Sequence, residues 1–178
     1  MVIFLGSWAV MFAALFLAFA MYRLTTPEWP PPILTLIPQT IPAVVTALII
    51  LSSITLMWGN RAYLKGHLGR LRRHLAGTTI LALAFMGLQV AFWSDLLAKD
   101  VTPAYNIFSG HLYLLTLFHG LHVLVGLALL VNLYRKTAQL VQSNDNPNQL
   151  ALSLKLTSMF WHFVGVAWIF TFLLLFIL

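Results

Sequence analysis

The chain has 178 residues, of which 61% are hydrophobic and only 8% are charged. A soluble domain carries about 25% charged residues, and a chain of this length could not hide so much apolar surface from water. The composition excludes a soluble globular domain, a disordered tail and a disulfide scaffold, and the lack of cysteine excludes thiolate metal sites.

Five runs of sequence are apolar over about 20 residues, the length that a helix needs to cross a bilayer. Uniformly apolar runs favour helices, because barrel strands would alternate polar and apolar residues. The first run lacks a basic flank and is too long for a signal peptide, so we expect it to stay in the mature chain. The sequence predicts an all-α integral membrane bundle that forms a single domain over residues 1–178. The expected spans are 2–22, 40–59, 77–97, 109–134 and 156–178.

Two connections between these spans have distinctive compositions. Residues 26–32, TPEWPPP, predict a stiff extended connector, because proline fixes φ and has no N–H to donate. Residues 142–149, QSNDNPNQ, predict a polar turn.

The charged residues predict the orientation of the bundle. The connections after the first and third spans carry Arg23 and Lys99 with Glu28 and Asp100. The other two connections are strongly basic, so the positive-inside rule predicts the N-terminus inside and the C-terminus outside. This placement also explains the net charge of +6 without a nucleic-acid partner. The basic residues of those two connections are Arg61, Lys65, Arg70, Arg72 and Arg73, and then Arg135, Lys136 and Lys155.

Small residues recur every seven positions along three of the spans. Helices in lipid pack closely through such residues, because apolar burial gives them no drive to associate. The stripes therefore predict contacts inside the bundle or with a neighbouring chain. They are Gly77, Ala84, Ala91 and Ala98; Gly6, Ala13 and Ala20; and Thr46, Ser53 and Asn60.

Histidines lie inside the fourth and fifth spans. At about 100° per residue, His111, His119 and His122 fall within about 80° of one another on a helical wheel. Ser158 and His162 likewise share one face of the fifth span. Ionisable residues in a membrane usually face protein or water, so these five residues predict a polar face with a structural role.

Three interpretations of this polar face can be compared. A metal site would usually add carboxylates at the same depth, and none is in reach. A haem held by two histidines needs ligands at matching depth, but His122 lies about 18 Å and His162 about 9 Å from the inner ends of their spans. The third interpretation is neutral histidines that hydrogen-bond across helices, so no catalytic, cofactor-binding or metal residue is expected on this chain.

Several segments resemble one known family in the right order along nearly the whole chain. The most specific is LLTLFHGLHVLVGLALL, residues 114–130, followed by FWHFVGVAWIFTF, residues 160–172. Trp29-Pro30-Pro31, the segment LSSIT at 51–55 and Leu88-Gln89 fit the same pattern. The chain resembles subunit III of the haem–copper terminal oxidases, in its five-helix form.

This resemblance implies a non-catalytic subunit of a respiratory oxidase that reduces oxygen and pumps protons. The chain would stabilise the catalytic subunit and bind phospholipid, with oxidase subunits I and II as partners and haem and copper held by those subunits. The complex would take electrons from cytochrome c or quinol, in a bacterial cytoplasmic membrane. Two alternatives stay open: an accessory subunit of a nitric oxide reductase-like complex, and a b-type cytochrome anchor that uses His122 or His119 with His162. A small transporter would need an intramembrane charge or broken helices, which the spans lack.

The chain departs from the family at three positions that usually carry acids: Ala9, Phe92 and Gly165. Losing a set of buried polar partners together leaves none of them unpaired. The departures imply that no role of the family's carboxylates carries over to this chain and that the chain belongs to a diverged branch.

Overall fold

A computed structural model describes residues 2–27, 31, 37, 39–143 and 148–177. Its helices are α1 (Val2–Thr25), α2 (Thr40–Leu64), α3 (Leu68–Ala98), α4 (Ile107–Ser143) and α5 (Asn148–Phe172), and a π-helical segment, η2 (Leu173–Ile177), continues α5. Within the described residues, 5 helices are long and apolar enough to cross a membrane. The prediction of an all-α bundle with five candidate spans is confirmed. Residues 28–30 and 32 of the proline-rich connector and residues 144–147 of the polar turn lie outside the described residues.

Three helices extend well beyond their expected apolar runs. Helix α3 begins at Leu68 rather than at 77, α4 ends at Ser143 rather than at 134, and α5 begins at Asn148 rather than at 156. Many basic residues of the chain lie in these added turns, because a helix can continue past the apolar layer once its side chains reach water. Helices α2 and α3 are joined by a tight turn at Gly66, whose φ of 74° favours glycine.

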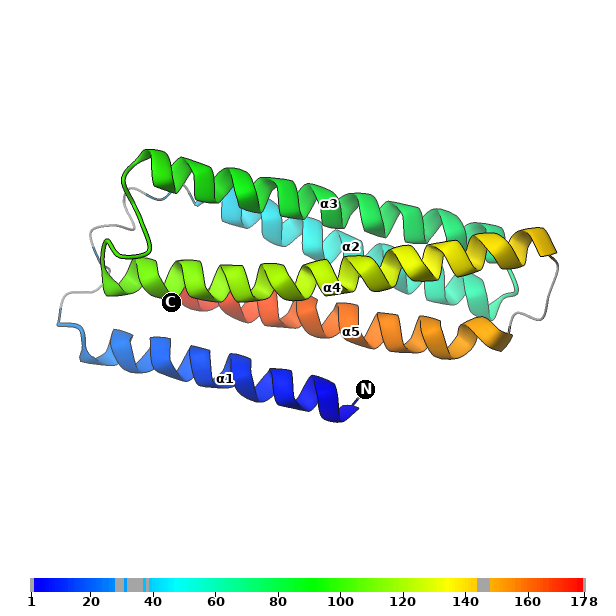
Figure 1. Cartoon of the computed structure of the whole chain (residues 1–178), viewed down its shortest axis with the longest axis horizontal. Helices are drawn as coiled ribbons and strands as arrows, with labels where there is room; N and C mark the ends of the chain where they lie inside the picture. The colour runs from blue at the N-terminus through cyan, green and yellow to red at the C-terminus, as the bar shows by residue number, and fades with distance from the viewer. Residues whose placement is uncertain (1, 28–30, 32–36, 38, 144–147, 178) are drawn as a thin grey trace.

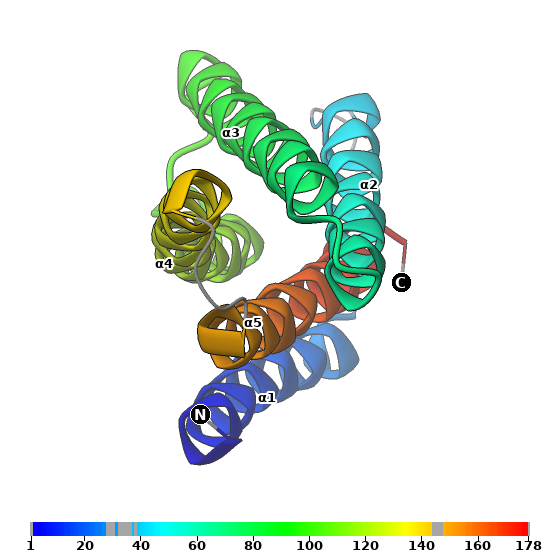
Figure 2. The ribbon, with the colours of Figure 1, turned by 90° about the vertical axis from the view of Figure 1, so that its right-hand side faces the viewer.

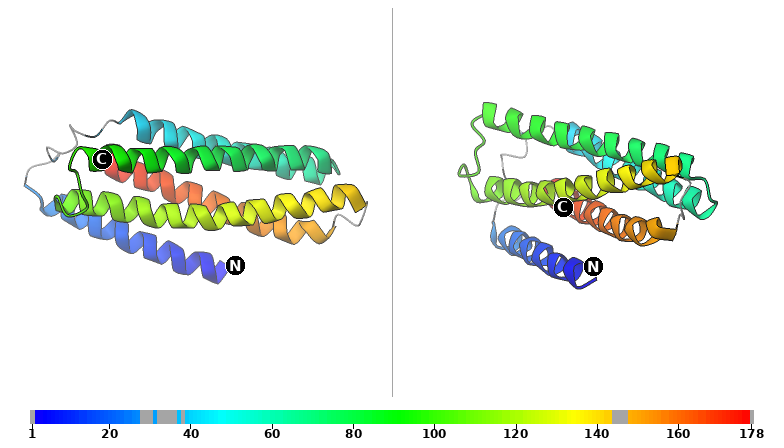
Figure 3. Two further views of the ribbon diagram at one scale, coloured as in Figure 1. Left: turned by 45° about the horizontal axis from the view of Figure 1, so that its top comes forward. Right: turned by 45° about the vertical axis from the view of Figure 1, so that its right-hand side comes forward.

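Helices α2, α3, α4 and α5 form a four-helix ring, and α1 lies outside the ring beside α5 (Figure 1, Figure 2). Figure 3 shows α1 at the outer edge of the bundle in both of its views. Aromatic side chains dock α1: the Phe12 ring lies 6.4 Å from Phe163 on α5, and the Phe19 ring lies 6.0 Å from Phe108 on α4.

The two basic connections lie at the same end of the bundle. Figure 1 shows the α2–α3 turn, the end of α4 and the start of α5 together at one end, with the C-terminus at the other. This arrangement is compatible with the charge pattern, but the side of the membrane that each end faces stays a prediction.

The apolar core is built mainly from large side chains of the ring. Phe85, Trp161 and Trp168 are almost fully buried and belong to one cluster of residues from α2 to α5. A second cluster, nearer the C-terminal end, contains Phe92 and Phe108 together with Phe19 of α1. Because both clusters include residues from α4, this helix ties the two halves of the bundle together.

The small-residue stripes face different directions. Thr46, Ser53 and Asn60 of α2 are half-buried, and the structure places them against α5. Three members of the α3 stripe and two of the α1 stripe are instead exposed, so of the two predicted kinds of contact only the one with a neighbouring chain stays open for them. Those exposed residues are Ala84, Ala91 and Ala98, and Gly6 and Ala13.

Candidate functional site

A seam of hydrogen bonds joins α2 to α5, and we call it the α2–α5 seam. Trp168 Nε1 donates to Thr46 Oγ1 at 2.9 Å, and Trp161 Nε1 donates to Ser52 Oγ at 3.1 Å. Nearer the basic end, Asn60 Nδ2 donates to Ser158 Oγ at 2.9 Å. An unpaired N–H is costly in lipid, so these bonds favour one alignment of the two helices.

Further hydrogen bonds connect the other helices of the ring. Trp93 Nε1 on α3 donates to Thr116 Oγ1 on α4 at 3.0 Å, and the Thr55 and Thr78 hydroxyls link α2 to α3 at 2.9 Å. The predicted polar face did not include these donors and acceptors, because it was built from histidines and one serine. The sequence feature that could have predicted the tryptophan bonds is a serine or threonine on one span and a tryptophan on another.

Among the described residues, the hydrogen bonds of His111 and His122 stay within their own helix. His111 Nδ1 lies 2.8 Å from the carbonyl oxygen of Ile107, and His122 Nδ1 lies 2.6 Å from that of Phe118, one turn earlier on the same helix. The expected cross-helix hydrogen bonds are therefore wrong for these two residues. Their contacts with another helix are ring contacts to α1: His111 stacks on Tyr22 at 5.6 Å, and His122 lies 3.9 Å from Trp8.

His119 has an aromatic environment. Its side chain is fully buried, and neither ring nitrogen has a hydrogen-bond partner among the described residues. The ring lies 5.6 Å from Phe85 on α3 and 4.8 Å from Trp168 on α5. His119 therefore fills the centre of the ring of helices as an aromatic side chain would.

Ser158 and His162 point toward α2 instead. Both line an opening between α2 and α5 that also includes Asn60. The predicted polar face is thus divided among three directions: His111 and His122 toward α1, His119 toward α3 and α5, and Ser158 and His162 toward α2. The helical wheels predicted which residues share a face of one helix, but they could not predict which neighbouring helix each residue contacts.

Among the described residues, the histidines do not gather into a metal cluster. The openings that His162 lines do not include His119 or His122. Within the described residues, no group of three or more His, Cys, Asp or Glu side chains could hold a metal ion.

Helices α4 and α5 approach closely at Gly126, the glycine of the motif that carries the family resemblance. A Cβ built at Gly126 would lie 2.8 Å from the ring of Trp161 and 3.2 Å from the ring of Phe160. Glycine at this position therefore allows two large aromatic side chains of α5 to pack directly on the backbone of α4.

The three positions that lack the family's acids face different neighbours. Ala9 lies in a groove between α1 and α5, and Gly165 packs against Ser53 of α2. Phe92 contacts Phe176 of η2, with ring centroids 6.3 Å apart.

The helices are long and apolar enough to cross a membrane, and hydrogen bonds from tryptophan to hydroxyl groups join α2 to α5. The fold therefore defines the class of the chain as a membrane helix bundle. The family described as Cytochrome c oxidase subunit III matches residues 1–178. The chain belongs to the cytochrome c oxidase subunit III family.

Individual relatives give the same result. A protein of Thermostichus vulcanus named cytochrome c oxidase subunit 3 is 30% identical over 100% of this chain and 85% of its own length. The protein of the same name from Synechocystis is 28% identical over 99% of this chain and 73% of its own length. The one from Latimeria chalumnae is 32% identical over 96% of this chain and 65% of its own length. The resemblance found in the motifs is confirmed.

Proposed function

We propose that this chain is a non-catalytic subunit III of a haem–copper oxidase and that it works by packing against the catalytic subunit. The observation that carries the proposal is the family match over the whole of residues 1–178. The hydrogen-bonded ring of helices supports it, because a body of fixed shape is suited to hold a neighbouring subunit in place. The redox centres belong to the partner subunits, which are oxidase subunits I and II.

The surroundings of the complex follow from the same proposal. Electrons come from cytochrome c or quinol and reach oxygen through the partner subunits, while this chain excludes water and holds lipid at their side. We place the complex in a bacterial cytoplasmic membrane, with the basic end of this chain inside. The two cyanobacterial relatives support a bacterial source.

The test is affinity purification of the tagged chain from native membranes in a mild detergent. We expect a large subunit that contains haem and copper to co-purify. Removal of this chain should leave the initial rate of oxygen consumption largely unchanged and shorten the time over which turnover persists. An unchanged turnover lifetime, or a chain that purifies alone, would contradict the proposal.

The same preparation distinguishes the two alternatives. Co-purification of a nitric oxide-reducing complex would indicate the accessory-subunit alternative. A Soret band in the isolated chain that disappears in His122→Ala would indicate a b-type cytochrome anchor.

A further inference from the structure

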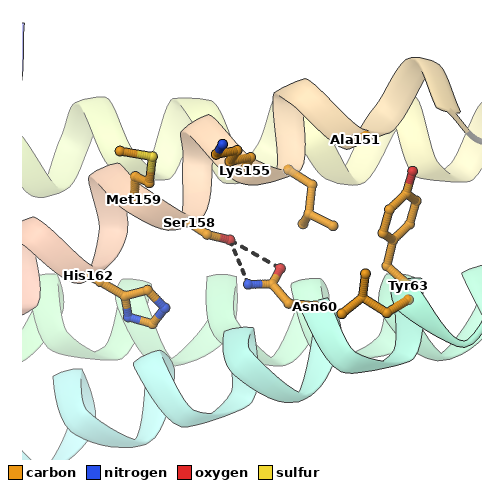
Figure 4. A pocket seen from close by; sticks show the side chains of 9 residues that line it. Asn60, Tyr63, Ala151, Lys155, Ser158, Met159 and His162 are labelled. Atoms are coloured by element: carbon orange, nitrogen blue, oxygen red, sulfur yellow. Dashed lines mark hydrogen bonds between the residues drawn. The ribbon is translucent and has the colours of Figure 1, made fainter. Parts of the chain in front are cut away.

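Two openings between α2 and α5 meet at His162. The one near the basic end has a volume of about 380 Å³, and the one nearer the C-terminus has a volume of about 220 Å³. His162 lines both, so they form one continuous groove, which we call the outer groove. Figure 4 shows its part near the basic end, where Asn60 and Ser158 hydrogen-bond to each other between the two helices.

The lining of the outer groove repeats with the heptad spacing of helices that pack lengthwise. Steps of three and four residues alternate along both helices, and this spacing presents one continuous stripe to a neighbouring helix. On α5 the stripe consists of Ala151, Lys155, Ser158, His162, Gly165 and Ile169. On α2 it consists of Ile50, Ser53, Met57, Asn60 and Leu64. The two stripes lie side by side, so together they offer a site for a third helix.

The outer groove is long enough for a helix that crosses the membrane. From Ala151 to Ile169 the lining follows about 27 Å of α5, and the hydrocarbon core of a bilayer is about 30 Å thick. An acyl chain belongs to one leaflet and would cover only about half of this length. The length of the groove therefore favours a transmembrane helix as its occupant.

The outer groove combines a small-residue floor with large side chains at its sides. A Cβ at Gly165 would lie 3.2 Å from Ser53 Oγ, so α2 and α5 approach closely at this point of the floor. Small residues let the backbone of a neighbouring helix come near. Ile50, Met57 and Ile169 are exposed at the sides, so their surface is available to the occupant.

Two basic side chains on the α5 stripe lack partners. The described residues supply neither a hydrogen-bond partner nor a carboxylate for His162 or Lys155. Ionisable side chains inside a membrane usually pair with another polar group, so the half-buried His162 points to a partner outside this chain. Lys155 lies two turns from His162 on the same stripe. The group that complements this face is therefore acidic.

We propose that the outer groove binds a transmembrane helix of another subunit, and that this helix places an acidic side chain at His162. The imidazole N–H donates a hydrogen bond to the carboxyl oxygen, while the apolar side chains of the two stripes pack against the rest of the helix. The inference rests on the proposed function, because it takes the chain as one subunit of a larger membrane complex.

The first test identifies what fills the outer groove in the intact complex. A photoreactive benzoylphenylalanine replaces Ile50 on α2 or Ile169 on α5, and the adducts formed on illumination are sequenced by mass spectrometry. Both positions should form adducts with the same transmembrane segment of another subunit, and that segment should contain an acidic residue. Adducts with lipid alone, with a second copy of this chain, or with a segment that has no acidic residue would overturn the proposal.

The second test addresses the hydrogen bond at His162. His162→Leu removes it, whereas the matched control His162→Gln keeps a side chain that can donate and accept. Intact complexes are titrated with a denaturing detergent, and retention of the cross-linked subunit is measured. We expect His162→Leu to lower retention about threefold, the value for one hydrogen bond between membrane helices, with a smaller effect from His162→Gln. Retention in His162→Leu as high as in His162→Gln would overturn the proposal.

The third test fills the outer groove without changing a polar group. Met57→Trp places an indole ring in the groove, and Leu51→Trp places the same ring at an exposed position of α2 outside both linings. Met57→Trp should lower retention of the cross-linked subunit, and Leu51→Trp should leave it unchanged. Equal retention in the two variants would overturn the proposal.

Co-purification separates this proposal from the proposed function. A haem- and copper-containing subunit that still purifies with the unmodified chain, together with adducts to lipid alone, would count against the helix site only. Loss of that subunit from the unmodified chain would count against the proposed function.

Discussion

The backbone of Gly126 lies directly against the ring of Trp161, so close that a methyl group at position 126 would come within 2.8 Å of two ring carbons. The Trp161 ring is fully buried and its Nε1 is held by Ser52 of α2. Because the ring is fixed on its far side, it cannot move away without breaking that hydrogen bond. The contact therefore couples three helices at one point.

Gly126→Ala should destabilise the subunit for this reason. Inserting a methyl group into a packed core costs about 1–3 kcal/mol, and we expect a lower melting temperature of the complex and easier loss of this subunit. Gly77→Ala is the matched control, since nothing lies within 4 Å of a Cβ at Gly77 and alanine favours helix. Similar melting temperatures for the two variants would refute the coupling.

The hydrogen bond between Trp168 and Thr46 should be measurable by a double-mutant cycle. Thr46→Val leaves the indole N–H unpaired, and we expect a coupling energy of about 0.6 kcal/mol with Trp168→Phe, the typical value for such bonds in membranes. Thr171→Val is the control, because the Thr171 hydroxyl donates to Ala167 of its own helix. Stability is measured as retention of the subunit during titration with a denaturing detergent. A coupling energy of zero would show that the bond does not contribute.

His119→Phe should preserve or raise the stability of the subunit. Both nitrogens of His119 lack partners among the described residues, and burying an unpaired polar group costs about 1–3 kcal/mol. The rings of Phe85 and Trp168 offer the new side chain an aromatic environment. The melting temperature of the complex is the measurement, and a clear decrease would show that the imidazole has a partner in the assembly.

Restoring the family's acid at position 165 should be harmful here. Gly165 is buried, and a Cβ there would lie 3.2 Å from Ser53 Oγ. We expect Gly165→Asp to cost about 2.5–3.5 kcal/mol in the membrane and to lower the amount of assembled complex. Gly165→Ala separates the effect of size from that of charge, and equal yields of the two variants would contradict this expectation.

The orientation of the chain can be tested by labelling introduced cysteines, because the sequence has no cysteine of its own that would react. Gly69→Cys lies at the basic end of the bundle, and Ala104→Cys lies in the exposed connection between α3 and α4. In intact cells, a maleimide that cannot cross the membrane should label the cysteine at position 104 and spare the one at 69. The reverse pattern would mean that the positive-inside rule fails for this protein.

The sequence predicted the spans well, because about 20 apolar residues in a row have few alternatives to a membrane helix. It predicted their ends less well at Leu68 and Ser143, where polar residues continue the helices beyond the apolar layer.

The sequence was weaker on the directions that helix faces take. A helical wheel groups residues on one face, but in lipid the outside of a bundle is as apolar as its inside. The pattern therefore did not reveal that Ala84 and Ala91 face outward, or that His119 and His122 meet different helices. Tertiary packing decides these directions.

The position of α1 has a consequence for biogenesis. Helix α1 is synthesised before α4 and α5, yet these two later helices carry Phe108 and Phe163, two of the aromatic side chains that hold it. Helix α1 can therefore make its final contacts with these side chains only after α4 and α5 have entered the bilayer. The first half of α1 carries no charged side chain, which suits a helix that contacts lipid before those partners arrive.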